Sequence, residues 1–99
     1  MSFVVTSDVL VAEEGAEVLQ AAFADRLRLV EGHPGFQRLE VWRDERDPGA
    51  FVMVSWWDDE DAFRTYMRSP DHRRSHSRIP VDPARARPAG LRRFRRVSD

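Results

Sequence analysis

The chain has 99 residues, of which 41% are hydrophobic and 33% are charged. This size and balance fit one globular domain spanning residues 1–99 and argue against intrinsic disorder. No apolar run is long enough to span a membrane, and the first residues lack the pattern of a signal peptide. Cysteine is absent, which excludes disulfides and thiolate metal sites. We therefore expect a cytoplasmic protein with no membrane partner.

Charge is distributed unevenly along a chain whose net charge is −1. Nine of the sixteen basic residues, all of them arginine, lie after Ser69, where there are only three acidic residues. A basic end of this kind can bind phosphates or carboxylates. The domain as a whole is not basic and carries no nucleic-acid-reading motif, so we expect no nucleic-acid partner.

Residues 2–11 predict the first strand, because apolar side chains alternate on both of its faces. Ser7 and Asp8 are polar, lie near its middle and point to opposite faces. Each either lines a cavity or lies at the rim of the sheet, because a buried polar group needs a partner. Apolar residues recur at helical spacing from Ala16 to Val30 and predict an amphipathic helix, which Gly32 and Pro34 end.

Residues 35–44 and 50–57 predict two further strands, which form a hairpin around the turn residues Asp47 to Gly49. Trp56 and Trp57 are neighbours and therefore point to opposite faces of the third strand. Trp56 either lines a ligand cavity or packs in the core of a dimer, and we favour the core.

Asp58 predicts the start of a second helix, with Asp61 three residues later in a capping-box-like position. Ser69 is a favourable N-cap and Pro70 a favourable first residue for a short third helix. Residues 80–90 predict a proline-rich loop, and residues 90–98 predict the last strand.

The β-α-β-β-α-β order predicts an α+β, ferredoxin-like fold with a four-stranded antiparallel sheet and helices on one face. Phe36, Trp42 and Phe51 have no evident partner within one chain. We therefore expect the other face of the sheet to be covered by a second copy, which makes the protein a homodimer.

The chain resembles the antibiotic biosynthesis monooxygenase superfamily, whose members are dimeric α/β-barrels. The resemblance extends in element order over nearly the whole chain. Its motifs are the step Pro34-Gly35-Phe36, the run from Trp57 to Phe63, and His76 ten residues after the aromatic Tyr66. The first two motifs are structural, whereas the third is similar to the IsdG-type heme-degrading branch.

That resemblance implies a set of site residues. His76 matches the histidine that ligates heme iron in that branch, a role that suits neutral imidazole. Tyr66 stands where that branch has a tryptophan. Ser7 stands where it has an asparagine, or Asp8 does if the register shifts by one. Ser7, Tyr66 and His76 are thus the catalytic candidates. Arg73 is the candidate for binding heme propionates, together with the nearby arginines Arg74, Arg78, Arg85 and Arg87.

A zinc ion is an alternative ligand for the histidines. His72 and His76 lie one helical turn apart and can share a metal, but a zinc site usually needs a third protein ligand. We expect His33 to lie far away in a turn, and His72 to lie on the surface or to hydrogen-bond a neighbour. Tyr66 is either a cavity wall or a core aromatic beside Phe63.

The sequence contains no Ser-His-Asp set, phosphate-binding loop or dinucleotide fingerprint. Three functions therefore stay open, and each needs a small hydrophobic or aromatic ligand. The first is a heme-binding or heme-degrading monooxygenase. The second is a cofactor-independent monooxygenase that oxidises an aromatic polyketide-type substrate to a quinone, with Tyr66, His72, His76 or Asp8 helping to deprotonate a phenol. The third is a dimeric ligand-binding module without a redox step. His76 favours the first, whereas the changed tryptophan and asparagine positions favour the others.

Overall fold

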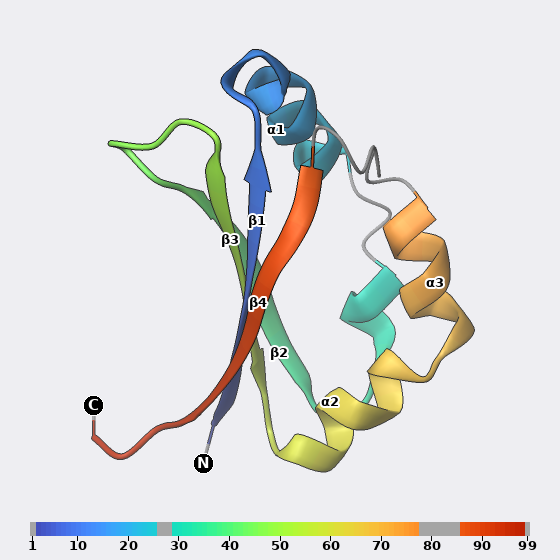
Figure 1. Ribbon diagram of the computed structural model, residues 1–99. Coiled ribbons are helices and arrows are strands. Elements are labelled where there is room, and N and C mark those ends of the chain that lie inside the picture. Colours follow the sequence, from blue (N-terminus) through green and yellow to red (C-terminus); the bar gives the residue numbers. More distant parts are fainter. Residues whose placement is uncertain (1, 26–28, 78–85, 99) are drawn as a thin grey trace.

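The computed structural model describes residues 2–25, 29–77 and 86–98 (Figure 1). The side chains of residues 29, 75–77 and 86–89 also lie outside the description. The strands are β1 (Phe3–Val11), β2 (Phe36–Arg43), β3 (Ala50–Trp57) and β4 (Ala86–Arg95). The helices are α1 (Ala16–Ala24), α2 (Glu60–Met67) and α3 (Pro70–Ser77), with the short 3-10 helices η1 (Glu13–Gly15) and η2 (Leu29–Gly32) on either side of α1.

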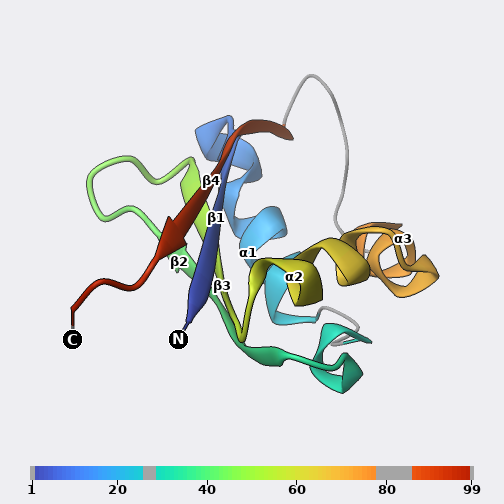
Figure 2. The same cartoon turned by 90° about the horizontal axis from the view of Figure 1, so that it is seen from below.

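The strands form a four-stranded sheet in the order β2-β3-β1-β4, and every neighbouring pair is antiparallel. Seen from below, α1, α2 and α3 all lie on the same side of this sheet (Figure 2). We call that side the helix face and the opposite side the open face. The predicted α+β, ferredoxin-like fold is confirmed.

Two buried clusters form the core, and both lie on the helix face. The first contains Val5, Val30, Trp57, Phe63 and Tyr66. The second contains Ala16, Leu19, Phe23 and Phe51 and packs α1 against the sheet. Trp57 is only 1% exposed, and its Nε1–H donates a hydrogen bond of 2.8 Å to Ser55 Oγ. The indole is therefore buried without leaving its polar atom unsatisfied.

The expectation that Phe36 and Phe51 lie on the face covered by a second copy is wrong. The pairing of β2 with β3 shifts register between Phe36 and Arg38, which moves Phe36 to the opposite face from the one its alternation predicts. Phe36 packs edge-on against Trp57 with ring centroids 5.3 Å apart. Phe51 is buried against Phe23 on α1. Of these three aromatics, Trp42 alone lies on the open face, where it is 50% exposed.

The loop before β2 is docked closely against α2. Gly35 has a φ of +82°, which favours glycine, and a Cβ built there would lie 2.5 Å from the Cβ of Ala62. The carbonyl of Gly35 accepts a hydrogen bond of 2.8 Å from the N–H of Asp58. The Pro34-Gly35-Phe36 step therefore joins two elements of the core.

Helix boundaries differ from the expectations in two places. Asp59, rather than Asp58, caps α2, because its Oδ1 accepts a hydrogen bond of 2.8 Å from the N–H of Ala62. α1 ends at Ala24 instead of continuing to Val30, and Leu27 lies outside the described residues. The third helix begins at Pro70 as predicted, and Ser69 Oγ accepts a hydrogen bond of 3.3 Å from the N–H of His72.

The last strand begins at Ala86, earlier than predicted, and it includes Pro88. A proline is tolerated there because β4 is an edge strand and its pairing with β1 is irregular between Asp8 and Val9. Among the described residues, no helix is long and apolar enough to cross a membrane.

Candidate active site

Ser7 lies on the helix face of β1, between the two core clusters. Val5 belongs to the first cluster and Val9 packs against the second. In the sheet register Ser7 is paired with Met53 on β3 and Leu91 on β4. Ser7 and Met53 are half-buried, and Leu91 is 48% exposed. The Ser7 position is therefore set in a partly exposed apolar strip of the sheet, on the side that carries the helices.

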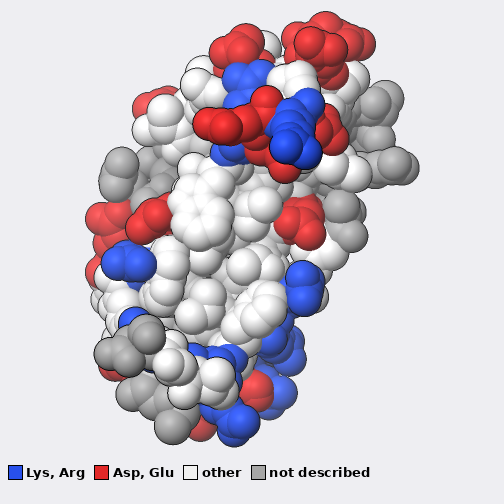
Figure 3. Space-filling view, turned by 90° about the vertical axis from the view of Figure 1, so that its left-hand side faces the viewer, with Lys and Arg blue, Asp and Glu red and all other residues white. Residues whose placement is uncertain are grey.

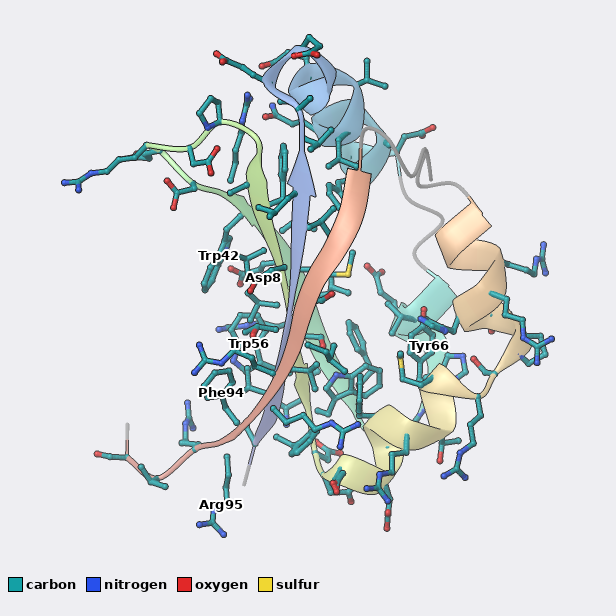
Figure 4. The ribbon with its side chains drawn as sticks, viewed as in Figure 1. Asp8, Trp42, Trp56, Tyr66, Phe94 and Arg95 are labelled. Atoms are coloured by element: carbon teal, nitrogen blue, oxygen red, sulfur yellow. The ribbon has the colours of Figure 1, made fainter. Side chains whose placement is uncertain are left out.

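Asp8 lies on the other side of the sheet. It is paired with Val52 and Gly90, and Figure 4 shows it on the same side as Trp42 and Trp56, with Tyr66 on the opposite side. The alternative in which a register shift brings Asp8 into the site is therefore wrong, and so is a role for Asp8 in deprotonating a substrate there. Trp56 likewise lies on the open face, which rules it out as a wall of a helix-face cavity.

Tyr66 is 7% exposed and belongs to the first core cluster. Its ring lies 5.5 Å from that of Trp57. The rings of His33 and His72 meet it edge-on, with centroids 4.9 Å and 5.3 Å away. Tyr66 is thus a core aromatic held between two imidazoles, and its catalytic role stays a prediction.

His33 was expected to lie far from the other histidines, and that expectation is wrong. Its Nε2 lies 3.1 Å from Asp71 Oδ2 on α3, close enough for a hydrogen bond or an ion pair. His33 and His72 both contact the ring of Tyr66, so these two histidines lie close together. His72 is half-buried rather than at the surface. Sequence pattern could not find this cluster, because His33 and Asp71 are 38 residues apart and no local periodicity links them.

Two of the remaining site residues, Arg73 and His76, belong to α3. His76 belongs to α3, but its side chain lies outside the described part of the structure. Arg73 is exposed on the same helix. Arg74, also expected near the propionates, is exposed on α3 as well. Arg78 and Arg85 lie outside the described residues, and so does the side chain of Arg87. Within the described residues, no group of three histidine or acidic side chains is arranged to hold a metal ion.

Sequence comparisons with known proteins indicate one family. Residues 2–78 match the antibiotic biosynthesis monooxygenase family. A curated relative from Staphylococcus saprophyticus, the heme oxygenase (staphylobilin-producing), is 33% identical over 76 residues, which cover 75% of this chain and 72% of the relative.

Solved structures show the same fold. A putative antibiotic biosynthesis monooxygenase from Bordetella bronchiseptica superposes with a TM-score of 0.82 at 16% identity, covering 98% of each chain. SnoaB, a cofactor-independent oxygenase from Streptomyces nogalater, superposes with a TM-score of 0.75 at 20% identity, covering 99% of this chain and 95% of its own. The chain belongs to the antibiotic biosynthesis monooxygenase family, and it is an oxygenase.

Proposed function

We propose that this monooxygenase binds heme on the helix face and degrades it, with His76 as the axial ligand of the iron. The observation that carries the proposal is the 33% identity to a curated heme oxygenase over three quarters of the chain. The retention of a histidine ten residues after the helix aromatic, in α3, supports it.

The chemistry of the donor set fits heme. The strip around Ser7, with Met53 and Leu91, offers apolar surface for a flat macrocycle. A histidine on α3 supplies the nitrogen ligand that heme iron accepts. Arg73, exposed on the same helix, can pair with a carboxylate at the solvent side.

The residues of this chain would hold and orient the ligand. Bound heme would supply the iron that activates dioxygen and the porphyrin that is oxidised, with electrons from an external reductant. Ser7 carries a hydroxyl that can donate or accept a hydrogen bond within an otherwise apolar strip. Tyr66 contacts both His33 and His72, so its buried ring supports the histidines beside the proposed site. The apolar side chains around Ser7 would exclude bulk water from the reacting ligand.

A second function is favoured by Ser7 and Tyr66, the two positions that differ from the heme-degrading branch. The serine and tyrosine that replace the asparagine and tryptophan of the heme-degrading branch suit a cofactor-independent oxygenase, which would oxidise an aromatic polyketide-type substrate. In that case the imidazole of His72 would accept the phenolic proton, and the adjacent Tyr66 hydroxyl could hydrogen-bond the resulting phenolate. A ligand-binding module without redox chemistry is not retained, because the family is one of monooxygenases.

We also propose that the protein is a cytoplasmic homodimer of one domain per chain. The dimer is supported by the open face, where Trp42, Phe94 and Leu10 are exposed apolar side chains. Figure 3 shows mostly uncharged side chains across the middle of this face and charged side chains towards its ends. A second copy would cover this surface. A chain without cysteine needs no oxidising compartment to fold, which supports the proposed location.

Titration of the purified protein with hemin tests the proposal. We expect a saturable Soret band at one heme per chain, which His76→Ala abolishes. His72→Phe, one turn earlier, removes the other α3 imidazole but keeps a ring against Tyr66; it is the matched control and should retain the band. Ascorbate added under oxygen, with catalase present to remove peroxide, should then bleach the band and release a bilin-like product. If the wild-type protein gives no specific band, heme is excluded, and phenolic polyketides become the substrates to test.

A further inference from the structure

Helix α3 has no apolar stripe of its own. Its sequence from Pro70 to Ser77 is PDHRRSHS. Among its described side chains, Pro70, Arg73 and Arg74 are exposed, and Asp71 and His72 are half-buried. Most helices in proteins are held in place by burial of an amphipathic face. This helix gains little from such burial, so its orientation depends on specific polar and ring contacts.

The contact between His33 and Asp71 joins α3 to a distant part of the chain. The two side chains meet at 3.1 Å, and they are 17% and 41% exposed. His33 follows η2, and Asp71 lies in the first turn of α3, where the helix dipole also favours an acidic residue. A charge-assisted contact between these two groups fixes direction as well as distance.

Two backbone hydrogen bonds and one ring contact hold His33 in place. The N–H of His33 donates a hydrogen bond of 3.0 Å to the carbonyl of Val30, a buried core residue. Its own carbonyl accepts a bond of 3.2 Å from the N–H of Phe36 at the start of β2. Its ring packs edge-on against buried Tyr66. Asp71 is therefore tied, through His33, to the first core cluster.

We propose that His33 and Asp71 are a positioning pair that holds α3 in the orientation needed to present His76 to the helix face. This inference rests on the proposed function, because His76 is the candidate iron ligand. A partly exposed pair contributes little to global stability. Its effect is local, because a segment with few buried apolar contacts opens independently of the rest of the fold.

Amide hydrogen exchange on the ligand-free protein tests the tether. His33→Phe keeps an aromatic ring against Tyr66 but removes the hydrogen bond, and Asp71→Ala removes its partner. Both should speed exchange across α3 roughly tenfold, while β1 and β3 stay unchanged. His33→Gln keeps an N–H donor at similar reach and should restore slow exchange. Glu60→Gln is the matched control, because Glu60 pairs at 3.4 Å with Arg64 within α2 alone.

The heme-loaded protein tests the link to His76. His33→Phe and Asp71→Ala should speed hemin dissociation roughly tenfold and shift the Soret maximum, whereas His33→Gln and Glu60→Gln should do neither. Unchanged exchange in α3 would overturn the proposal, and so would faster exchange with unchanged hemin dissociation and Soret maximum. If the wild-type protein binds no hemin, the proposed heme function fails, and faster α3 exchange in both variants still establishes the tether.

Discussion

The two faces of the sheet are built from alternating residues of the same strands, yet their side chains differ in exposure and in the partners they contact. Trp57 on the helix face is 1% exposed and hydrogen-bonded to Ser55. Trp56, its neighbour in sequence, is half-buried on the open face beneath the guanidinium of Arg38, whose Cζ lies 4.0 Å from the ring centroid. Ser7 and Asp8 divide in the same way on β1. The helix face thus carries both core clusters and the candidate site, while the open face carries exposed apolar side chains that we propose a second copy covers.

The largest expected effect comes from truncating the helix-face tryptophan. Trp57→Ala should lower the free energy of unfolding by about 3–5 kcal/mol, because it leaves a cavity among Phe36, Phe63 and Tyr66. Urea denaturation measures this loss. Trp56→Ala is the control and should cost clearly less at protein concentrations where the chain is monomeric. Equal losses in the two variants would remove the distinction between the faces.

A charge placed on the open face should act on assembly instead. Trp42→Asp replaces an indole that is 50% exposed with a carboxylate. It should weaken the proposed dimer roughly hundredfold, as expected for an interface aromatic, with little change in the fold. Sedimentation equilibrium measures the dissociation constant. Val97→Asp, at a side chain that is 86% exposed near the C-terminus, is the control. A dimer unaffected by Trp42→Asp would place the interface elsewhere.

The start of α2 offers a smaller effect. Asp59→Ala removes the side-chain cap from the N–H of Ala62 and should cost about 1 kcal/mol of unfolding free energy. Asp61→Ala, in the first turn of the same helix, controls for the loss of a negative charge near the helix dipole. Thermal or urea unfolding measures both variants. If Asp61→Ala costs as much as Asp59→Ala, charge rather than capping accounts for the loss.

The smallest expected effect lies in the β2–β3 turn, away from both faces. Hydrogen bonds from the backbone N–H groups of Asp47 and Arg46 lower the pKa of Asp44. A carboxyl whose pKa is depressed by folding stabilises the protein above its unfolded pKa, and this stabilisation is lost as pH falls through the folded pKa. Asp44→Asn should therefore remove a small part of the acid sensitivity of unfolding below about pH 4. An unchanged pH profile would contradict this.

Much of the fold could be predicted from the sequence because its signals are local. Alternation predicted the strands, Asp47 to Gly49 predicted the turn, and Ser69-Pro70 predicted the start of α3. Phe36 was placed on the wrong face because a one-residue register shift is not visible in the pattern of β2. Two adjacent aspartates both suit a cap, and Asp59 takes that position while the N–H of Asp58 is bonded to Gly35.

The candidate site was less predictable because it joins distant segments. Ser7 and Tyr66 were proposed from a family resemblance, and the structure brings both to the helix face. The contacts of Tyr66 with His33 and of His33 with Asp71 depend on how η2 packs against α3, which no short stretch of sequence encodes. Asp8 could be removed from the site only once the register of β1 was known.

The most direct test of the central claim is a two-dimensional ¹H–¹⁵N NMR titration with hemin, observing the three tryptophan indole N–H signals. Trp57 reports on the helix face, and Trp42 and Trp56 report on the open face. Paramagnetic heme bound on the helix face should broaden the Trp57 signal most strongly, and the effect should saturate at one heme per chain. Broadening of Trp42 and Trp56 with a sharp Trp57 signal, or no saturable effect on any of them, would contradict a heme site on the helix face.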